Sequence, residues 1–243
     1  MKLAKMSIPL LVSLLCATSL FAQTRRSQTE IYTGAAFPLG PDWFKDFYKI
    51  GLSGNVQYVL FPSQRLGIPI FVGYEGFTVD ANAIANASAA DLVGRPILDA
   101  SGNPRGTVIN GNIDATGSAS AIKFGIGARP YLTRPESSTQ FFLFGTATYN
   151  FLMQKTKING GEYTGRDFLG NVQTFPITNA DIVTVYGGTE FEVKPKKFGL
   201  TAGGGFELPA GESLNLILQG LFNIIFTDTE STTFLGVTAG VVF

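Results

Sequence analysis

Five charged residues lie in segments that otherwise hold mainly apolar and small residues, and they are the residues best placed for chemistry. In an extended chain alternate side chains point to opposite faces, and each of these charges falls opposite large apolar side chains. If the charged faces enclose one interior, three acids and two bases are buried there and should pair, because an unpaired buried charge is costly. They are Glu30, Glu75, Lys123, Arg129 and Glu207.

Two functions are open to such a set of buried charges. One is a polar plug that makes the fold rigid, and the other is a path for protons, ions or small solutes. We expect the plug if the interior is that of a β-barrel of about eight strands, the fold that the strand pattern of the sequence predicts. Such a barrel is just wide enough to be filled by its own side chains.

Histidine, a residue type on which many catalytic and metal sites depend, is missing. The chain contains no histidine, which excludes histidine-dependent triads and most zinc sites. Lys123 has no serine partner at a diagnostic spacing. We therefore expect no enzyme activity, no metal site and no cofactor. The acids of the long polar segments match no calcium-loop pattern; they are Asp80, Asp91, Asp99, Asp114, Glu162, Asp167 and Asp181.

The beginning of the chain reads as a signal peptide, residues 1–22. Lys2 and Lys5 precede an apolar run from Ser7 to Phe21, and Ala22 offers a cleavage point. The run is shorter than the roughly 20 residues of a membrane-spanning helix. The single cysteine, Cys16, lies inside it, so the exported chain has no disulfide.

Composition limits the partners of the exported part. Without Lys2 and Lys5 the chain keeps 16 basic and 18 acidic residues, a net charge of −2. This balance gives no reason to expect nucleic-acid binding. The 29 glycines, 21 phenylalanines and only 15% charged residues fit strands that pass through lipid.

Residues 23–243 read as one antiparallel β-barrel. Segment 213–226 alternates most cleanly, with Leu216, Leu218 and Phe222 on one face and Asn215 and Gln219 on the other. The expected strands are 30–37, 50–60, 68–79, 118–132, 140–154, 198–208, 213–226 and 232–243. This fold class is all-β, a closed up-and-down transmembrane barrel of eight strands. Ten strands are the alternative if 158–164 and 182–193 also cross the membrane.

Connection lengths give the orientation of this barrel. Odd connections are mostly long and even ones short, which is typical of outer-membrane barrels with long extracellular loops and short periplasmic turns. The long loops are 80–117, with a helical turn or two near 83–93, and 155–197. Aromatic residues at the strand ends are expected to form girdles, with Tyr58, Phe61, Tyr131, Phe141 and Phe243 on the periplasmic side and Phe37, Trp43, Phe44 and Phe47 on the outer side.

Two stretches carry a resemblance to a known family. The sequence GGGFEL at 203–208 and the terminal GVTAGVVF at 236–243 resemble the small outer-membrane β-barrel proteins of Gram-negative bacteria, of the OmpA/OmpX-like kind. The resemblance implies an outer-membrane location and a last strand that serves as the signal for the barrel-assembly machinery. The matching positions are Val237, Ala239, Val241 and Phe243.

Three functions follow as expectations. The first is a plugged barrel that acts as a structural or surface-interaction protein through its outer loops, surrounded by outer-membrane lipid. The second is a narrow porin for ions or small solutes. The third is a soluble lipid-binding barrel, which would need an apolar interior and a polar exterior.

Overall fold

The computed structural model describes residues 27–98, 101, 103–177, 189–211, 214–228 and 230–243. The expected signal peptide, residues 1–22, lies outside this range, and so does most of the strand-like stretch 182–193. None of the helices within the described ranges is both long and apolar enough to cross a membrane.

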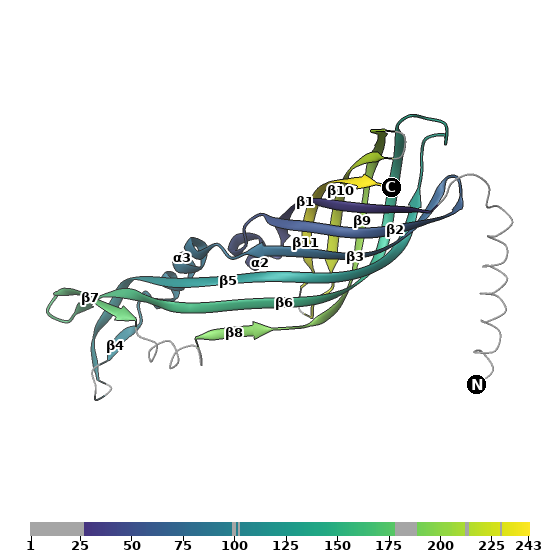
Figure 1. Cartoon of the computed structure of the whole chain (residues 1–243). Helices are drawn as coiled ribbons and strands as arrows, with labels where there is room; N and C mark the ends of the chain where they lie inside the picture. The colour runs from purple at the N-terminus through teal and green to yellow at the C-terminus, as the bar shows by residue number, and fades with distance from the viewer. Residues whose placement is uncertain (1–26, 99–100, 102, 178–188, 212–213, 229) are drawn as a thin grey trace, which may run out of the picture.

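Eight antiparallel strands close into a ring, as the sequence predicts (Figure 1). Each strand pairs with the next strand of the ring along the chain, and the last pairs with the first from Glu30↔Val242 onward. The ten-stranded alternative is wrong, because residues 158–164 continue a strand that has already crossed the ring. The ring consists of β1 (Gln28–Gly40), β2 (Gly51–Ser63), β3 (Leu66–Thr78), β5 (Pro104–Pro130), β6 (Gln140–Asp167), β9 (Lys196–Pro209), β10 (Asn215–Ile225) and β11 (Thr232–Val242).

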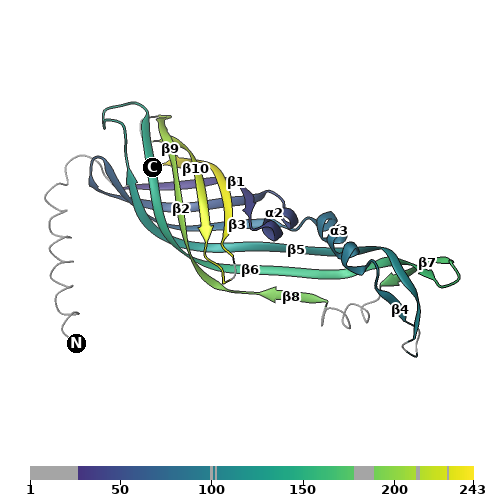
Figure 2. The same cartoon turned by 180° about the vertical axis from the view of Figure 1, so that it is seen from behind.

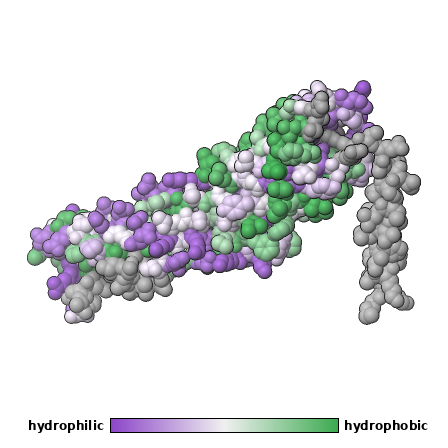
Figure 3. Space-filling model, viewed as in Figure 1, coloured by the Kyte–Doolittle hydropathy of each residue, from purple (hydrophilic) through white to green (hydrophobic). Residues whose placement is uncertain are grey.

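The two faces of the ring have opposite chemistry. On β10, Leu216 and Phe222 are 48% and 40% exposed, whereas Gln219 and Asn223 are buried. On the face seen in Figure 3, hydrophobic side chains gather in a band on the barrel. A soluble lipid-binding barrel would need the reverse arrangement. The faces therefore fit a barrel that stands in hydrocarbon, with every spanning backbone group bonded within the closed sheet.

Two strands continue far beyond the ring. The sequence pattern places the start of one at 118 and the end of the other at 154, but β5 begins at Pro104 and β6 ends at Asp167. Their pairing runs on from Gly117↔Thr156 to Gly106↔Asp167. The alternation of large apolar residues stops at the ring because no lipid faces the strands beyond it, and this is why the extension reads as loop.

We call this extension the projecting sheet. It comprises residues 104–117 of β5 and 155–167 of β6, with the short strands β4 (Pro96–Leu98), β7 (Val172–Ile177) and β8 (Glu190–Val193) added at the edges. Helix α3 (Ala81–Leu92) lies along it (Figure 2). Ile84 and Leu92 of α3 pack on a buried cluster of Ile113, Ala115 and Ile158, so the projection has a small core of its own.

The mouth of the barrel on the side of the projecting sheet is lined by aromatic residues. The short helix α2 (Asp42–Phe47) places Phe44 5.0 Å from Phe77, which lies 5.6 Å from Phe234, measured between ring centroids. Phe44 is therefore buried, and its expected place in the outer girdle is wrong. At the other end Tyr131 is also buried, against Phe142, rather than in the periplasmic girdle.

Candidate functional site in the barrel interior

Glu30 and Arg129 form an ion pair across the interior, between strands that are not neighbours in the ring. Arg129 Nη1 donates to Glu30 Oε1 at 2.6 Å, and Nη2 donates to Oε2 at 3.0 Å. Both side chains are buried. This two-bond geometry is the strong form of an arginine–carboxylate contact, and it ties β1 to β5 through the lumen.

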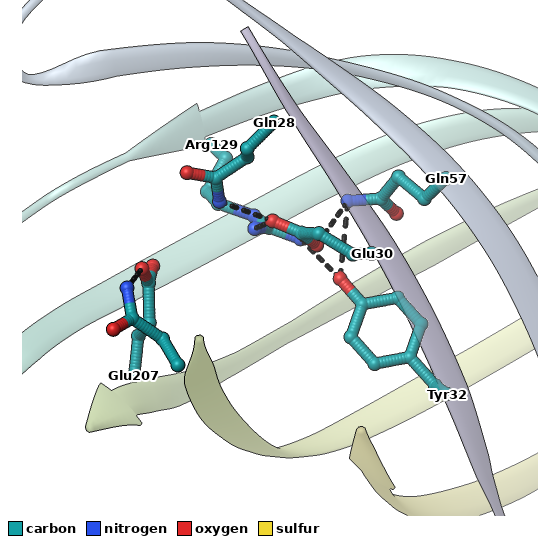
Figure 4. Close-up of polar contacts among 7 residues, drawn as sticks. Gln28, Glu30, Tyr32, Gln57, Arg129 and Glu207 are labelled. Carbon is teal, nitrogen blue, oxygen red and sulfur yellow. Dashed lines mark hydrogen bonds and ion pairs between the residues drawn. The ribbon is translucent and has the colours of Figure 1, made fainter. Parts of the chain in front are cut away.

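Neighbouring side chains complete the coordination of this pair (Figure 4). Gln28 and Gln57 donate their amide N–H groups to the two carboxylate oxygens of Glu30, at 2.5 Å and 2.9 Å. Tyr32 accepts a hydrogen bond from Arg129 at 3.0 Å. The guanidinium also lies 4.5 Å from the ring centre of Phe142, a cation–π contact. The pair is thus held in a single arrangement from several sides.

Lys123 and Glu75 form a second buried ion pair nearer the mouth. They come from the neighbouring strands β5 and β3, and Lys123 Nζ bonds Glu75 Oε1. Asn223 lies 3.5 Å from the same ammonium group and accepts a hydrogen bond from Thr201 at 2.7 Å. The other carboxylate oxygen of Glu75, Oε2, accepts no hydrogen bond from any residue within the described ranges.

The fifth predicted residue, Glu207, is buried but belongs to neither pair. Its Oε1 accepts a hydrogen bond from Asn215 at 2.7 Å, and Figure 4 places it apart from the group around Arg129. The structure therefore puts all five predicted charges inside the ring. It arranges them as two ion pairs and one carboxylate bound to an amide, rather than as one cluster.

A small cavity lies in the middle of the barrel. The cavity between Lys123 and Arg129 has a volume of only about 20 Å³, with walls that include Asn55, Thr146 and Gln219. Such a space is about what one water molecule needs.

Polar partners of the charges were absent from the set predicted from sequence. They include Tyr32 and Asn223, together with Thr201, which donates a hydrogen bond to Asn223, and all three are buried. The alternation that marks Glu30 also places Tyr32 on its face, two residues further along β1. Sequence spacing could therefore have found it, whereas the contact between Thr201 and Asn223 depends on the register of β9 and β10.

Three residues of the predicted assembly signal lie on β11 and the fourth, Phe243, directly follows it, all with their side chains toward the outer face. Val237 and Phe243 are 45% and 61% exposed. The backbone of Phe243 exchanges two hydrogen bonds with Thr29, at 2.9 Å and 3.2 Å. The end of the chain therefore closes the seam of the ring through its backbone, while Val237, Ala239, Val241 and Phe243 keep their side chains on the outside.

Within the described ranges, no three acidic, cysteine or histidine side chains come together as ligands for a metal ion. Asp99 and Asp181, two of the acids weighed for calcium, lie outside those ranges.

Comparison with known proteins gives matches in structure alone. No protein-family model and no curated protein sequence matches the chain. Among solved structures, a major outer membrane protein from Thermus thermophilus matches with a TM-score of 0.47 at 11% identity, covering 90% of this chain and 99% of that one. Neisserial surface protein A matches with a TM-score of 0.44 at 11% identity, covering 89% of this chain and 94% of that one.

A third match is the attachment invasion locus protein Ail of Yersinia pestis, with a TM-score of 0.41 at 12% identity, covering 90% of this chain and all, 100%, of that one. The architecture itself carries the assignment: a closed ring of eight strands, apolar outside and polar inside, is consistent with the small OmpA/OmpX-like outer-membrane β-barrels that the sequence resembles.

Proposed function

We propose that this chain is a non-enzymatic outer-membrane protein that contacts partners through its projecting sheet, while the barrel serves as a closed anchor. The observation that carries the proposal is the folded extension beyond the ring, together with the small size of the cavity in the middle of the lumen. A cavity of about 20 Å³ in the middle of the barrel supports the closed anchor. The buried cluster of Ile113, Ala115 and Ile158 supports a rigid projection rather than a loose loop.

The tip of the projection has the character of a contact surface. Phe168 and Leu169 are 75% and 88% exposed in the turn between β6 and β7. Large apolar side chains presented at an exposed tip favour contact with another surface. In this proposal Phe168 and Leu169 make the first contact and the polar sides of the sheet set its specificity.

The same turn is fixed by one carboxylate. Asn171 donates its side-chain N–H to Asp167 Oδ2 at 2.9 Å, and the backbone N–H groups of Leu169 and Asn171 donate to Oδ1 at 2.9 Å and 2.8 Å. These hydrogen bonds, led by that from the Asn171 side chain, lower the pKa of Asp167. A turn held in this way presents Phe168 and Leu169 in one conformation, which reduces the entropy lost on binding.

A barrel-only variant tests the surface role. Residues 80–117 and 155–192 are each replaced by a short Gly-Asn turn, joining Val79 to Ser118 and Gln154 to Val193, which lie beside each other on paired strands. Cells that display the full chain are expected to adhere better to hydrophobic and glycan-coated surfaces than cells that display equal amounts of this variant. Cells that display a full-length Phe168→Ser/Leu169→Ser variant are expected to adhere less well than cells with the full chain, but better than cells with the barrel-only variant. Equal adhesion by all three would refute the role.

A narrow channel is the second candidate, because charged groups line the lumen from Glu75 to Arg129. It requires the two ion pairs to separate during conduction. The assembly role of the last strand is also part of our proposal, and it rests on the exposed side chains of Val237 and Phe243. Both are given measurements in the Discussion.

A further inference from the structure

A second and much larger cavity lies at the mouth of the barrel, on the side of the projecting sheet. Its volume is about 430 Å³, within the range of about 300–1,000 Å³ that is usual for small-molecule sites. The wall is mainly aromatic and aliphatic and includes Trp43, Phe44, Phe77, Leu152, Ile225 and Phe234. We call it the mouth pocket.

One buried carboxylate lines the mouth pocket. Glu75 is fully buried, and Lys123 bonds only its Oε1. Its Oε2 has no donor among the described residues. A buried carboxylate oxygen without a donor is costly. Glu75 therefore provides a polar group to which a ligand in an otherwise apolar pocket could bind.

The charges of the lining select the sign of that ligand. Lys197 and Asp228 are paired with each other at the edge of the pocket. Once this pair is set aside, Glu75 is the charged side chain that remains among the lining residues, and Lys123 neutralises it from outside the lining. A ligand that donates a hydrogen bond suits this site, because the ionised carboxylate can only accept one, whereas a carboxylate or sulfate ligand has no hydrogen to donate to Oε2.

We propose that the mouth pocket binds a small apolar amine. The hydrocarbon part lies between the aromatic walls, and the ammonium group donates to Oε2 of Glu75. A charged donor is preferred to a hydroxyl group because hydrogen bonds between ionised partners are the stronger ones. This site would bind a small molecule in the mouth, separately from any contact that the projecting sheet makes.

The chain supplies its own probe for this site. Trp43 lines the pocket and is the single tryptophan of the sequence. The full-length protein is placed in phosphatidylcholine nanodiscs, whose lipid carries no primary amine, and Trp43 emission is followed during titration. The three ligands are decylamine, decan-1-ol and decanoate. We expect decylamine to bind about tenfold more tightly than decan-1-ol, the ratio set by the stronger charged hydrogen bond, and decanoate to bind most weakly.

Two variants separate the pocket from the surrounding lipid. Glu75→Gln should remove the tenfold preference for the amine, and Ala119→Leu, which places a larger side chain on the lining, should weaken both decylamine and decan-1-ol. Because Glu75→Gln leaves Lys123 buried without its partner, the double variant Glu75→Gln/Lys123→Gln repeats the test with neutral partners. Glu136→Gln makes the same chemical change in the turn at the other end of the barrel and should leave the affinities as they are.

Each opposite result overturns the proposal. Equal affinity for the three ligands, or titrations that Ala119→Leu does not change, would mean that the ligands only enter the bilayer. The absence of any emission change with decylamine would mean that the pocket does not bind it. If the preference survives in both Glu75 variants, the ammonium group is not held by Glu75. Cell adhesion by the projecting sheet is measured separately, so either proposal can fail alone.

Discussion

At the scale of single residues, the main feature is the contact between Arg129 and Glu30. Their two hydrogen bonds cross the lumen and join strands that are separated by β2 and β3 in the ring. Gln28 and Gln57 donate further hydrogen bonds to the carboxylate of Glu30. Removal of the arginine leaves the buried carboxylate with amide partners alone. An uncompensated buried charge destabilises a fold more than the loss of both partners does.

Arg129→Leu is expected to lower the free energy of unfolding by about 3–5 kcal/mol, the usual cost of removing one partner of a buried pair. The measurement is denaturant-induced unfolding of the purified protein in detergent, together with its resistance to heat on gel electrophoresis.

The double variant Arg129→Leu/Glu30→Leu is the control for this prediction. It leaves no isolated buried charge, so it should be more stable than the single variant, and the difference gives the coupling energy of the pair. Unchanged heat resistance in Arg129→Leu would show that the pair does not hold the barrel together.

At the scale of the elements, β11 closes the ring, and Phe243 directly follows it. It pairs with β1 on one side and β10 on the other. Phe243 joins the seam through its backbone alone, since its ring is exposed on the outer face. Folding stability and recognition during assembly can therefore be separated at this residue.

Phe243→Ala is expected to reduce the amount of barrel in the outer membrane of cells several-fold, while the purified variant refolds into detergent as fully as the wild type. The reason is that the substitution keeps the backbone bonds to Thr29 and removes the side chain offered to the assembly machinery. Membrane fractionation and refolding yield are the two measurements.

Phe226→Ala provides the matched control, because Phe226 is also an outward aromatic residue, 45% exposed, but lies just after β10 rather than at the end of the chain. Equal membrane levels of the Phe243 and Phe226 variants would contradict a signal at the terminus.

At the scale of the whole molecule, the chain consists of two joined parts, the barrel and the projecting sheet, whose surfaces differ in chemistry. Figure 3 shows the hydrophobic band on the barrel and largely hydrophilic side chains along the visible face of the projection. β5 and β6 run through both parts without interruption. The anchor therefore holds the projection by continuous backbone pairing instead of a flexible linker.

Purified full-length protein in planar bilayers is expected to give no steady ion current if the proposed closed anchor is right, because the cavity in the middle of the lumen is only about 20 Å³. The barrel-only variant should likewise give no steady current, since we expect the lumen to be closed between Lys123 and Arg129 rather than by the projecting sheet. A steady current from the full-length protein would favour the narrow channel. A current from the barrel-only variant alone would place the seal in the projecting sheet.

The alternation in 213–226 and 232–243 was enough to predict both the strands and the side that faces lipid. Apolar side chains face the hydrocarbon and mainly polar side chains face the lumen. Residues that cross the membrane therefore alternate between the two kinds with a period of two. The same period identified Glu30, Glu75, Lys123, Arg129 and Glu207 as inward residues, all of which are buried.

Only the tertiary structure decided which of these charges meet, because pairing depends on strand register and on the distance across the lumen. It joined Glu30 to Arg129 from strands far apart in the ring and left Glu207 with Asn215. It also showed that residues 104–117 form a strand. Their polar composition did not predict this, because a strand beyond the membrane faces no lipid and needs no alternation of apolar residues. The mouth pocket likewise depends on α2 folding back over Phe77, a contact that no local pattern encodes.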